Sequence, residues 1–467
     1  MRKIDAEALS IVDAVKQSWL KISEEVDPVG NIFMIFAHDL VVHFSGILIH
    51  RQAVSRYQTQ VHFPFVNKDY ALAPCSIRTN WDERSDDYFS IKKWIGRKRL
   101  TKVALGEALP LSTGKDQLSA KWMNLAGSKQ ESVEVFLPRF NEQIEALHEL
   151  ITDLSLEHGF NRVENIRNNW NQYVAANASV NQSIIRENGL LIGTRNSLQN
   201  RKLAANFLQQ AKPVVAITHG EVANSVMDEP PFGYSERTLC STLIDYGNAN
   251  ESGRFNEPWI RPRQTLSRHG RLAAKMFRPS NSIVLPDRRR TRVLYIPTTY
   301  HGNYLYGPFH IYEDDLYRKW QRTLFKAIPG LTFKAHPKSR AEPLNGVPID
   351  WRQLDTCIPE YDVLVFDYFA TGAMLALMSD KPVIYFDIGL RNLRDDFIAD
   401  LKRRCEYVKI DVSDLKRFDL DEALSQCWEA ATERTNEVIT RYVFCEAESV
   451  GWGAIFSAVN EGRIPGE

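Results

Sequence analysis

The chain has 467 residues, 44% hydrophobic and 25% charged, which is too long for one ordinary core and indicates two globular domains. Its 58 basic and 58 acidic side chains cancel to a net charge of zero, which argues against a protein whose overall positive charge binds nucleic acid. The six cysteines form no CxxC pair, a sparse usage that indicates a reducing compartment. We therefore expect local patches, and not overall charge, to bind any charged ligand.

The N-terminal sequence argues against export and against membrane insertion. Its first 21 residues, MRKIDAEALSIVDAVKQSWLK, predict an amphipathic helix, since no apolar signal-peptide core follows the basic start. The most apolar span, residues 32–50, is interrupted by His38, Asp39 and His43. It cannot cross a bilayer as one apolar helix of about 20 residues. These features predict a cytoplasmic protein.

The N-terminal half predicts a sheet with a long insertion. Residues 31–39, NIFMIFAHD, predict a strand, and a polar, helix-prone region covers about 80–180. A β-α-β unit follows, made of a strand at 189–194, a helix at about 196–210 and a strand at 212–220.

The C-terminal half alternates short apolar runs with helical patterns, which is typical of a parallel sheet covered on both faces. The expected strands are 291–300, 331–337, 361–367 and 381–387, and the expected helices are 313–330 and 370–380.

Two such halves predict an α/β fold with two Rossmann-like domains that face each other across a cleft, the architecture of nucleotide-sugar transferases. The proline-containing basic stretch at 277–292 marks the boundary. We expect an N-terminal acceptor-side domain at 1–285 with a helical insertion, and a nucleotide-sugar-binding domain at 286–440. A C-terminal helix in 441–467 could cross back to the first domain.

Polar residues at strand ends are the candidate site residues, because ligands of such sheets bind outside the carboxyl ends of the strands. They are His219, Glu221, Asp228 and Glu229 in the first domain, and Thr298, His336, Pro337, Lys338, Ser339, Asp367, Thr371 and Gly372 in the second.

Two of these segments suit a phosphate. A histidine and an ammonium at His336 and Lys338, presented by a rigid Pro337, can neutralise an anionic leaving group. Free N–H groups of a helix that starts near Thr371 can do the same, and Gly372 lets a ligand approach the backbone. The alternatives are a polar strand-end cap and a plain βα turn.

These segments also carry a family resemblance. The runs FKAHPK and YDVLVFDYFATGAMLALMSDKPVIYFD resemble the C-terminal domain of GT-B glycosyltransferases that build bacterial surface polysaccharides. The likeness is closest to the Kdo-transferase and capsule-synthesis groups and more distant to the CDP-glycerol transferases. KPVVAITHGEVAN, which contains His219, and YIPTTYHGNYLYG extend it in pieces over about 185–400.

The resemblance implies that His336 and Pro337, and Asp367 with Thr371, hold the phosphate and ribose of a CMP- or CDP-linked donor. Two departures stand out. Phe369 and Ala370 occupy positions that commonly hold Ser or Thr, and a glutamate common in the following helix falls on Leu375 or Ala376.

Glycosyl transfer also needs a carboxylate, as a base toward the acceptor or as a nucleophile. Glu221, Asp228 and Glu229, beside His219, are the available groups after the first-domain strand, although each could equally lie in a solvated loop. Two carboxylates about 5 Å apart would indicate double displacement, and a wider gap a general base. No metal ion or bound cofactor is expected.

The expected partners are a nucleotide-sugar donor, CMP-linked and Kdo-like, and a glycan or lipid-linked acceptor. The basic, apolar-interleaved run at 91–102 could rest on the inner membrane, or it could be a solvated face. The competing hypotheses are a CDP-glycerol-type polyol-phosphate transferase, a nucleotide-sugar epimerase, and a catalytically silent GT-B-like module that binds glycan or assembles a complex.

Overall fold

The structure is a computed structural model of the chain, and it describes mainly the second half in detail. The described residues are Ile35, 103–105, 110–112, 117–119, Glu149, Asp153, Leu156, 185, 187–193, 195, 198–218, 236–247, 264–268, 282–283, 291–298, 314–335, 344, 346–391, 393–415, 419–429, 432–433, 435–443 and 450–465.

The first sheet has five parallel strands in the order β1-β4-β5-β6-β7. The strands are β1 (Val103–Leu105), β4 (Gly189–Ile192), β5 (Val214–Ile217), β6 (Thr242–Tyr246) and β7 (Gln264–Arg268). Helix α6 (Leu198–Gln209) connects β4 to β5, which confirms the predicted β-α-β unit. Every residue of β4, β5 and β6 is buried, as expected for central strands of a covered parallel sheet.

The second sheet has six parallel strands in the order β11-β10-β9-β12-β13-β14. They are β9 (Val293–Ile296), β10 (Leu331–Lys334), β11 (Ile349–Asp350), β12 (Val363–Phe366), β13 (Val383–Asp387) and β14 (Glu406–Lys409). Numbered along the chain, the spatial order is 3-2-1-4-5-6, which is the strand order of the Rossmann fold. The predicted α/β fold with two parallel, Rossmann-like sheets is therefore confirmed.

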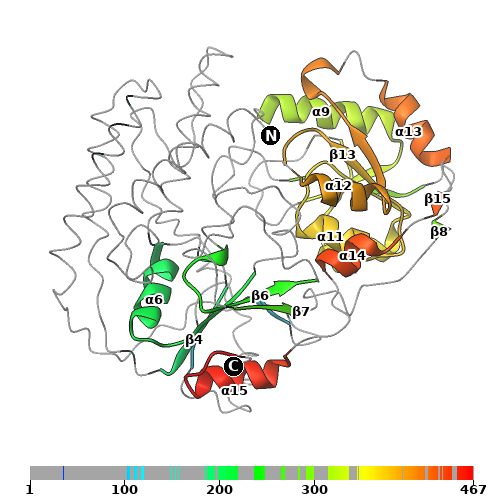
Figure 1. Ribbon diagram of the computed structural model, residues 1–467. Helices are drawn as coiled ribbons and strands as arrows, with labels where there is room; N and C mark the ends of the chain where they lie inside the picture. Colours follow the sequence, from blue (N-terminus) through cyan, green and yellow to red (C-terminus); the bar gives the residue numbers. More distant parts are fainter. Residues whose placement is uncertain are drawn as a thin grey trace.

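Helices cover both faces of the second sheet (Figure 1). They are α9 (Asp314–Ala327) and α13 (Leu420–Glu429) on one face, and α10 (Leu354–Cys357), α11 (Thr371–Leu377), α12 (Asp395–Lys402) and α14 (Glu437–Tyr442) on the other. Along β9, Tyr295 packs with Trp320 on the α9 face, whereas Leu294 and Ile296 pack on the α11 face. Because side chains alternate between two buried faces, the strand is apolar at every position.

The smaller elements complete the described part of the chain. Two antiparallel ladders pair β2 (Pro110–Ser112) with β3 (Gln117–Ser119), and β8 (Ser282–Ile283) with β15 (Thr432–Glu433). Two 3₁₀ turns lie at Ile358–Glu360 and Val412–Asp414.

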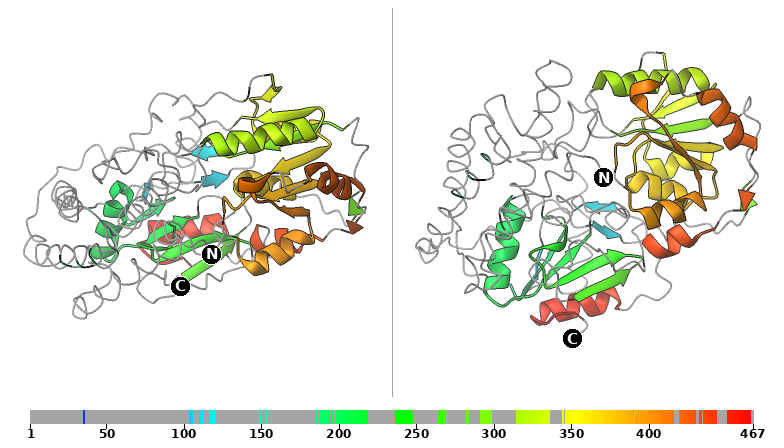
Figure 2. Two further views of the ribbon diagram at one scale, coloured as in Figure 1. Left: turned by 90° about the horizontal axis from the view of Figure 1, so that it is seen from above. Right: turned by 45° about the horizontal axis from the view of Figure 1, so that its top comes forward.

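The C-terminal helix α15 (Trp452–Asn460) returns to the first sheet, beside β4 (Figure 2). The Asn188 side chain donates a hydrogen bond of 2.7 Å to the carbonyl of Asn460. Gly189 lies so close to the helix that an added Cβ would stand 2.6 Å from a methyl group of Val459. The predicted crossing of the C-terminal helix is therefore confirmed.

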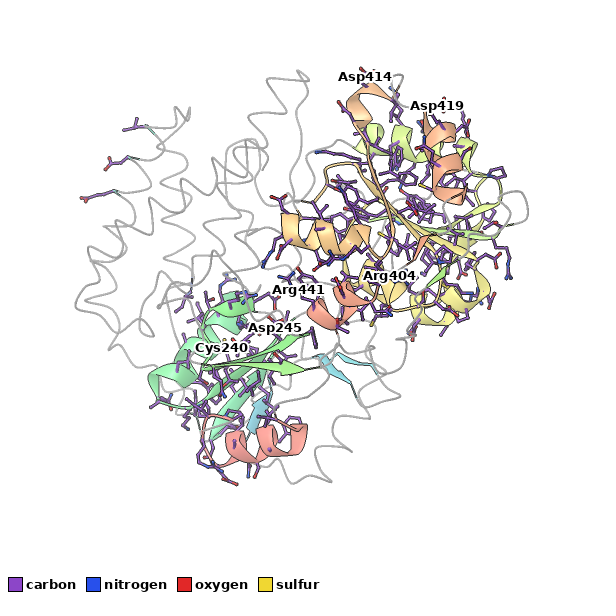
Figure 3. All side chains as sticks on the ribbon, turned by 45° about the vertical axis from the view of Figure 1, so that its right-hand side comes forward. Cys240, Asp245, Arg404, Asp414, Asp419 and Arg441 are labelled. Carbon is purple, nitrogen blue, oxygen red and sulfur yellow. The ribbon has the colours of Figure 1, made fainter. Side chains whose placement is uncertain are left out.

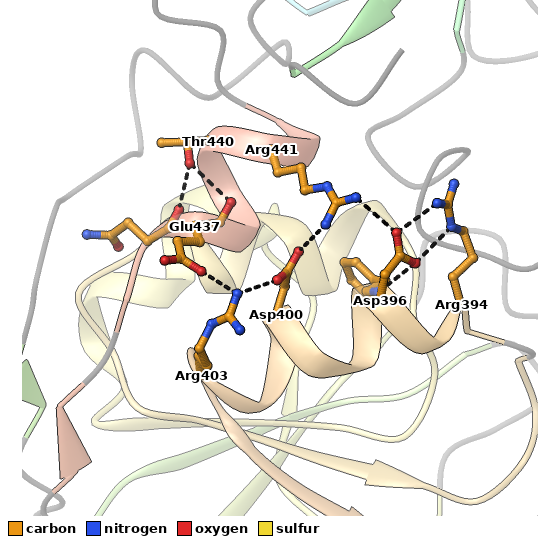
Figure 4. A network of polar contacts seen from close by, with 9 residues as sticks. Arg394, Asp396, Asp400, Arg403, Glu437, Thr440 and Arg441 are labelled. Atoms are coloured by element: carbon orange, nitrogen blue, oxygen red, sulfur yellow. Dashed lines mark hydrogen bonds and ion pairs between the residues drawn. The ribbon is translucent and has the colours of Figure 1, made fainter. Parts of the chain in front are cut away.

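Helix α14, in contrast, is held to α12 of the second sheet by ion pairs (Figure 4). Arg441 contacts Asp396 at 3.0 Å and Asp400 at 3.1 Å. Arg403 contacts Asp400 as well and also pairs with Glu437. Asp400 is 5% exposed, so its carboxylate depends on these two arginines for its charge partners.

The end of β6 meets α14 directly, through Gly247. This glycine has φ +72°, and an added Cβ would stand 2.5 Å from the backbone of both Arg441 and Tyr442. Figure 3 labels Asp245 of β6 and Arg441 of α14 on the two sides of this contact. The last helices therefore link the two sheets, because α14 packs on the second sheet and touches β6 while α15 packs on the first.

Two sequence predictions differ from the structure, and several of its strands were not predicted. Ile35 lies in a helix, so the strand predicted at 31–39 is wrong there. The C-terminal helix expected in 441–467 starts only at Trp452, and a separate helix, α14, ends before it at Tyr442, because residues 443, 450 and 451 are not helical. Strands β6, β7 and β14 carry polar residues such as Asp245 and Lys409, so no unbroken apolar run marked them. The domain boundaries stay predictions.

Replacing Gly247 with alanine should destabilise the protein far more than replacing Gly346. Both glycines have positive φ, which costs a non-glycine residue about 1–2 kcal/mol, but nothing lies within 4 Å of a Cβ at Gly346. The added methyl group at Gly247 would meet backbone atoms that cannot move aside independently. Urea unfolding of Gly247→Ala and Gly346→Ala measures the difference, and equal losses would contradict the close contact.

Arg441→Gln should lower the free energy of unfolding more than Arg463→Gln. Arg441 partners the buried Asp400, whereas the Arg463–Glu461 pair is exposed on both sides and contributes about 0–1 kcal/mol. Thermal unfolding at low and at high salt compares the two variants. Equal effects would show that the α12–α14 ion pairs contribute no more than a surface pair.

Candidate functional site

The centre of the second sheet is the point where its connections change direction. From β9 the chain moves outward to β10 and β11, and from β12 it moves the other way to β13 and β14. Ligands of such sheets bind at the carboxyl ends of the two strands that flank this switch point. Here these ends lead into Thr298 and into residues 367–372. Thr298, Asp367, Thr371 and Gly372 are four of the predicted donor-binding residues.

Asp367 lies completely inside the protein, in a hydrogen-bond network. Its carboxylate accepts hydrogen bonds from the Tyr295 hydroxyl, from the Trp320 indole at 3.0 Å and from the Tyr317 hydroxyl at 3.0 Å. The Tyr317 hydroxyl in turn accepts the backbone N–H of Thr298 at 3.2 Å. Asp367 therefore ties β12 to β9 and α9, and it acts on the switch point through the backbone of Thr298.

Burial raises the pKa of Asp367 to about 6, although the hydrogen bonds from Tyr295, Trp320 and Tyr317 act in the opposite direction. The desolvation of a charge in the protein interior is the larger effect at this position.

The segment that leads into α11 is anchored by aromatic packing. Phe369 is 1% exposed and packs edge-on against Phe397, with ring centroids 4.8 Å apart, and against Tyr385 at 5.7 Å. Ala370 is the N-cap residue, with an extended backbone and no side-chain hydrogen bond to the helix. Phe369, at a position where the resembled enzymes commonly carry Ser or Thr, thus fixes the helix start by packing. The backbone N–H groups of Thr371 and Gly372 lie in the first turn.

Gly372 has a packing reason to be glycine. An added Cβ would stand 3.2 Å from a methyl group of Leu354 and 3.7 Å from one of Ile296. The glycine lets α11 lie close to α10 and β9, as the third glycine of a Rossmann fingerprint does for its helix. The sequence hypothesis, in which Gly372 admits a ligand to the backbone, stays a prediction.

The far end of α11 is fixed by Arg404, which is 1% exposed (Figure 3). Its guanidinium donates hydrogen bonds to the carbonyls of Leu377 at 3.0 Å and Ser379 at 2.6 Å, where helix carbonyls need partners. Leu375 and Ala376, at the place of the family's glutamate, are buried in the core. Helix α11 is therefore a rigid, apolar element.

Lys334, the last residue of β10, is a polar group that the sequence analysis missed. It is 5% exposed, and its ammonium donates one hydrogen bond of 2.9 Å to the carbonyl of Ala335. The nearby Asp350 is already bonded by Arg352 and Tyr361. Burial lowers the pKa of Lys334. The ammonium thus lies at the carboxyl end of its strand, two residues before His336 in the chain. The signal in the sequence was a lysine inside an apolar run.

The remaining predicted site residues lie outside the described part of the chain. They are His219, Glu221, Asp228, Glu229, His336, Pro337, Lys338 and Ser339, and the basic run at 91–102 lies outside it as well. Strands β5 and β10 do end two residues before His219 and His336, at Ile217 and Lys334. The separation of the carboxylates and their roles stay predictions.

The described residues contain neither a cluster of metal-ligating side chains nor a membrane-spanning helix. No group of three or more His, Cys, Asp or Glu side chains there could hold a metal ion. Asp419, part of the DLD run at 419–421, caps α13 by accepting the N–H of Glu422 at 2.9 Å. No described helix is both long enough and apolar enough to span a bilayer.

Comparison with known proteins adds little to this geometry. No family model and no curated protein matches the sequence. Among solved structures, the glycosyltransferase SnogD from Streptomyces nogalater is similar at 11% identity and a TM-score of 0.28, over 62% of this chain and 74% of that one. The glycotransferase of kitacinnamycin is similar at 10% identity and a TM-score of 0.30, over 67% and 78%. Both proteins are of the class that the sequence resemblance predicts, but TM-scores this low decide nothing about this chain.

Asp367→Asn should flatten the pH dependence of stability. An unfolded aspartate has a pKa near 3.9, so between about pH 4 and pH 6 the folded protein binds more protons than the unfolded one. Stability should therefore fall across this range as the pH rises, by up to about 3 kcal/mol, and the asparagine variant should lack this component. Urea unfolding of both proteins from pH 4 to pH 7 measures it, and parallel profiles would contradict a raised pKa.

Proposed function

We propose that this protein is a GT-B-type glycosyltransferase that moves a sugar from a nucleotide donor to a glycan acceptor. The observation that carries the proposal is the strand order of the second sheet, which brings Thr298 and residues 367–372 to a switch point. The sequence resemblance to GT-B enzymes supports the proposal independently, because it falls on the same strand ends.

The donor half of the site would work by charge and by fixed backbone groups. His336 and Lys338 would neutralise the leaving phosphate, and the backbone N–H groups of Thr371 and Gly372 would donate hydrogen bonds to it. The packing of Phe369 and the hydrogen bonds of Arg404 support this role, since a rigid helix start loses little entropy when a ligand binds. Lys334 would add positive charge at the same edge.

The acceptor half would come from the first sheet. Glu221, Asp228 or Glu229, beside His219, would take the proton of the acceptor hydroxyl or attack the anomeric carbon. Such a mechanism needs no metal ion to stabilise the leaving group, and we propose a metal-independent transfer. We further propose a CMP-linked, Kdo-like donor and a surface-glycan acceptor, lipid-linked where the run at 91–102 rests on the membrane.

One observation favours a second candidate, a catalytically silent module with the same fold. Leu375 and Ala376 are core residues, so no carboxylate can extend from that part of α11 toward a donor. A silent module would keep its role after His336→Ala, whereas a transferase would lose turnover. A nucleotide-sugar epimerase differs from a transferase because it needs no acceptor. A polyol-phosphate transferase differs in its donor substrate.

Thermal-shift titration with CMP, CDP, UMP, UDP and GDP tests the proposal. A ligand present at about 100 times its dissociation constant should stabilise the fold by about 2.7 kcal/mol. We expect a cytidine nucleotide to stabilise the wild type and Lys326→Ala, a variant of an exposed residue on α9, but not His336→Ala. If no nucleotide raises the unfolding temperature of the wild type, the transferase proposal fails and the silent module replaces it.

A further inference from the structure

Tyr385, in the middle of β13, has a buried hydroxyl that the described structure leaves without a partner. The residue is 2% exposed, and no described group accepts a hydrogen bond from this hydroxyl or donates one to it. Buried polar groups are nearly always paired, and an unpaired one calls for an explanation such as strain, a functional role, or a water molecule or ion. The backbone of β13 is regular and paired on both sides, so strain is not the reason.

The hydroxyl lies near the carboxyl edge of the sheet. Tyr385 stands two residues before Asp387, the last residue of β13. Asp387 ends β13, Asp367 follows β12, and Arg391 follows β13. The ring of Tyr385 also packs at 5.7 Å against Phe369, which directly precedes α11. Tyr385 thus lies near the strand end that leads to the proposed donor site, and its ring contacts the residue before Ala370, the N-cap of α11.

The charged residues near the end of β13 already have interaction partners. One oxygen of the Asp387 carboxylate accepts the N–H of Gly389 at 3.0 Å, and the other accepts the hydroxyl of Tyr407. The guanidinium of Arg391 lies over the ring of Tyr368, 4.6 Å from its centroid. At this edge the Tyr385 hydroxyl is therefore left without a partner in the described structure, beside the aromatic rings of Phe369 and Tyr407.

Tyr442 provides an internal comparison. It is also 2% exposed, its hydroxyl also lacks a partner within the described structure, and its ring packs against Phe397 at 4.8 Å. Tyr442 lies on α14, however, and not on a strand of the sheet. The two tyrosines share burial and an unpaired hydroxyl, and they differ in the element that carries them, a strand of the second sheet for Tyr385 and helix α14 for Tyr442.

We propose that the Tyr385 hydroxyl binds a ribose hydroxyl of the donor nucleotide and is a specificity-determining residue of that site. This inference rests on the proposed function. The ribose would reach it from the carboxyl edge, between the ends of β12 and β13. A ribose hydroxyl can both donate to and accept from a tyrosine, so it satisfies the buried group in either direction.

Nucleotide binding by Tyr385→Phe and Tyr442→Phe tests the inference. Neither substitution removes a hydrogen bond seen in the described structure, so both variants should unfold at or slightly above the wild-type temperature. We expect the nucleotide that stabilises the wild type to bind Tyr385→Phe roughly 3- to 10-fold more weakly. The same nucleotide should bind Tyr442→Phe with unchanged affinity. The probes are CMP, CDP, UMP, UDP and GDP, with the 2′-deoxy and 3′-deoxy forms of whichever binds.

The deoxy nucleotides decide the assignment. One of the two deoxy forms should bind wild type and Tyr385→Phe equally, because the hydroxyl that contacts Tyr385 is missing. If the intact nucleotide binds Tyr385→Phe as tightly as wild type, the inference is overturned and the proposed function stands. If both deoxy forms lose as much affinity through Tyr385→Phe as the intact nucleotide does, the ribose assignment is overturned. If no nucleotide binds the wild type, both proposals are overturned.

Discussion

The arrangement of the second sheet depends on one buried carboxylate, that of Asp367. Tyr295 reaches it from β9, Tyr317 and Trp320 reach it from α9, and Asp367 itself follows β12. These elements meet at the switch point of the sheet, so the network fixes the relative positions of the two strands whose ends flank the proposed site. Burying the charge raises its pKa to about 6, a cost that three hydrogen bonds offset only in part. Such a network favours one arrangement of the site over others, because a shift of α9 would remove two of the three hydrogen bonds to a buried carboxylate.

The proposed donor site follows from this rigidity. Helix α11 is held at its start by the packing of Phe369, along its side by the close approach of Gly372 to Leu354, and at its end by Arg404. It needs no polar cap to keep its position. The replacement of serine and threonine by Phe369 and Ala370 therefore changes which groups face a ligand without loosening the helix. Polar recognition would pass to backbone N–H groups, to Tyr385, and to His336 and Lys338.

The C-terminal segment connects this site to the rest of the chain. Helix α14 is bound to α12 by arginine–carboxylate pairs and touches β6 at Gly247, and α15 then packs on β4. Contacts of this kind couple the position of the first sheet to that of the second. A transferase with its acceptor groups on one sheet and its donor groups on the other needs such a link, because the reacting atoms must meet at about 3 Å.

The sequence by itself determined the class of fold and most of the central strands. Unbroken apolar runs such as 363–366 can be buried only on both faces, and alternation with helices makes such strands parallel. It also determined that polar residues follow these strands. Strands with polar residues, such as β6 and β14, escaped prediction because their burial comes from neighbours far away in the chain. Only the tertiary structure decided the strand order, the enclosure of Asp367 and the unpaired state of the Tyr385 hydroxyl. Each of these depends on which distant side chains meet, and local pattern carries no information on that.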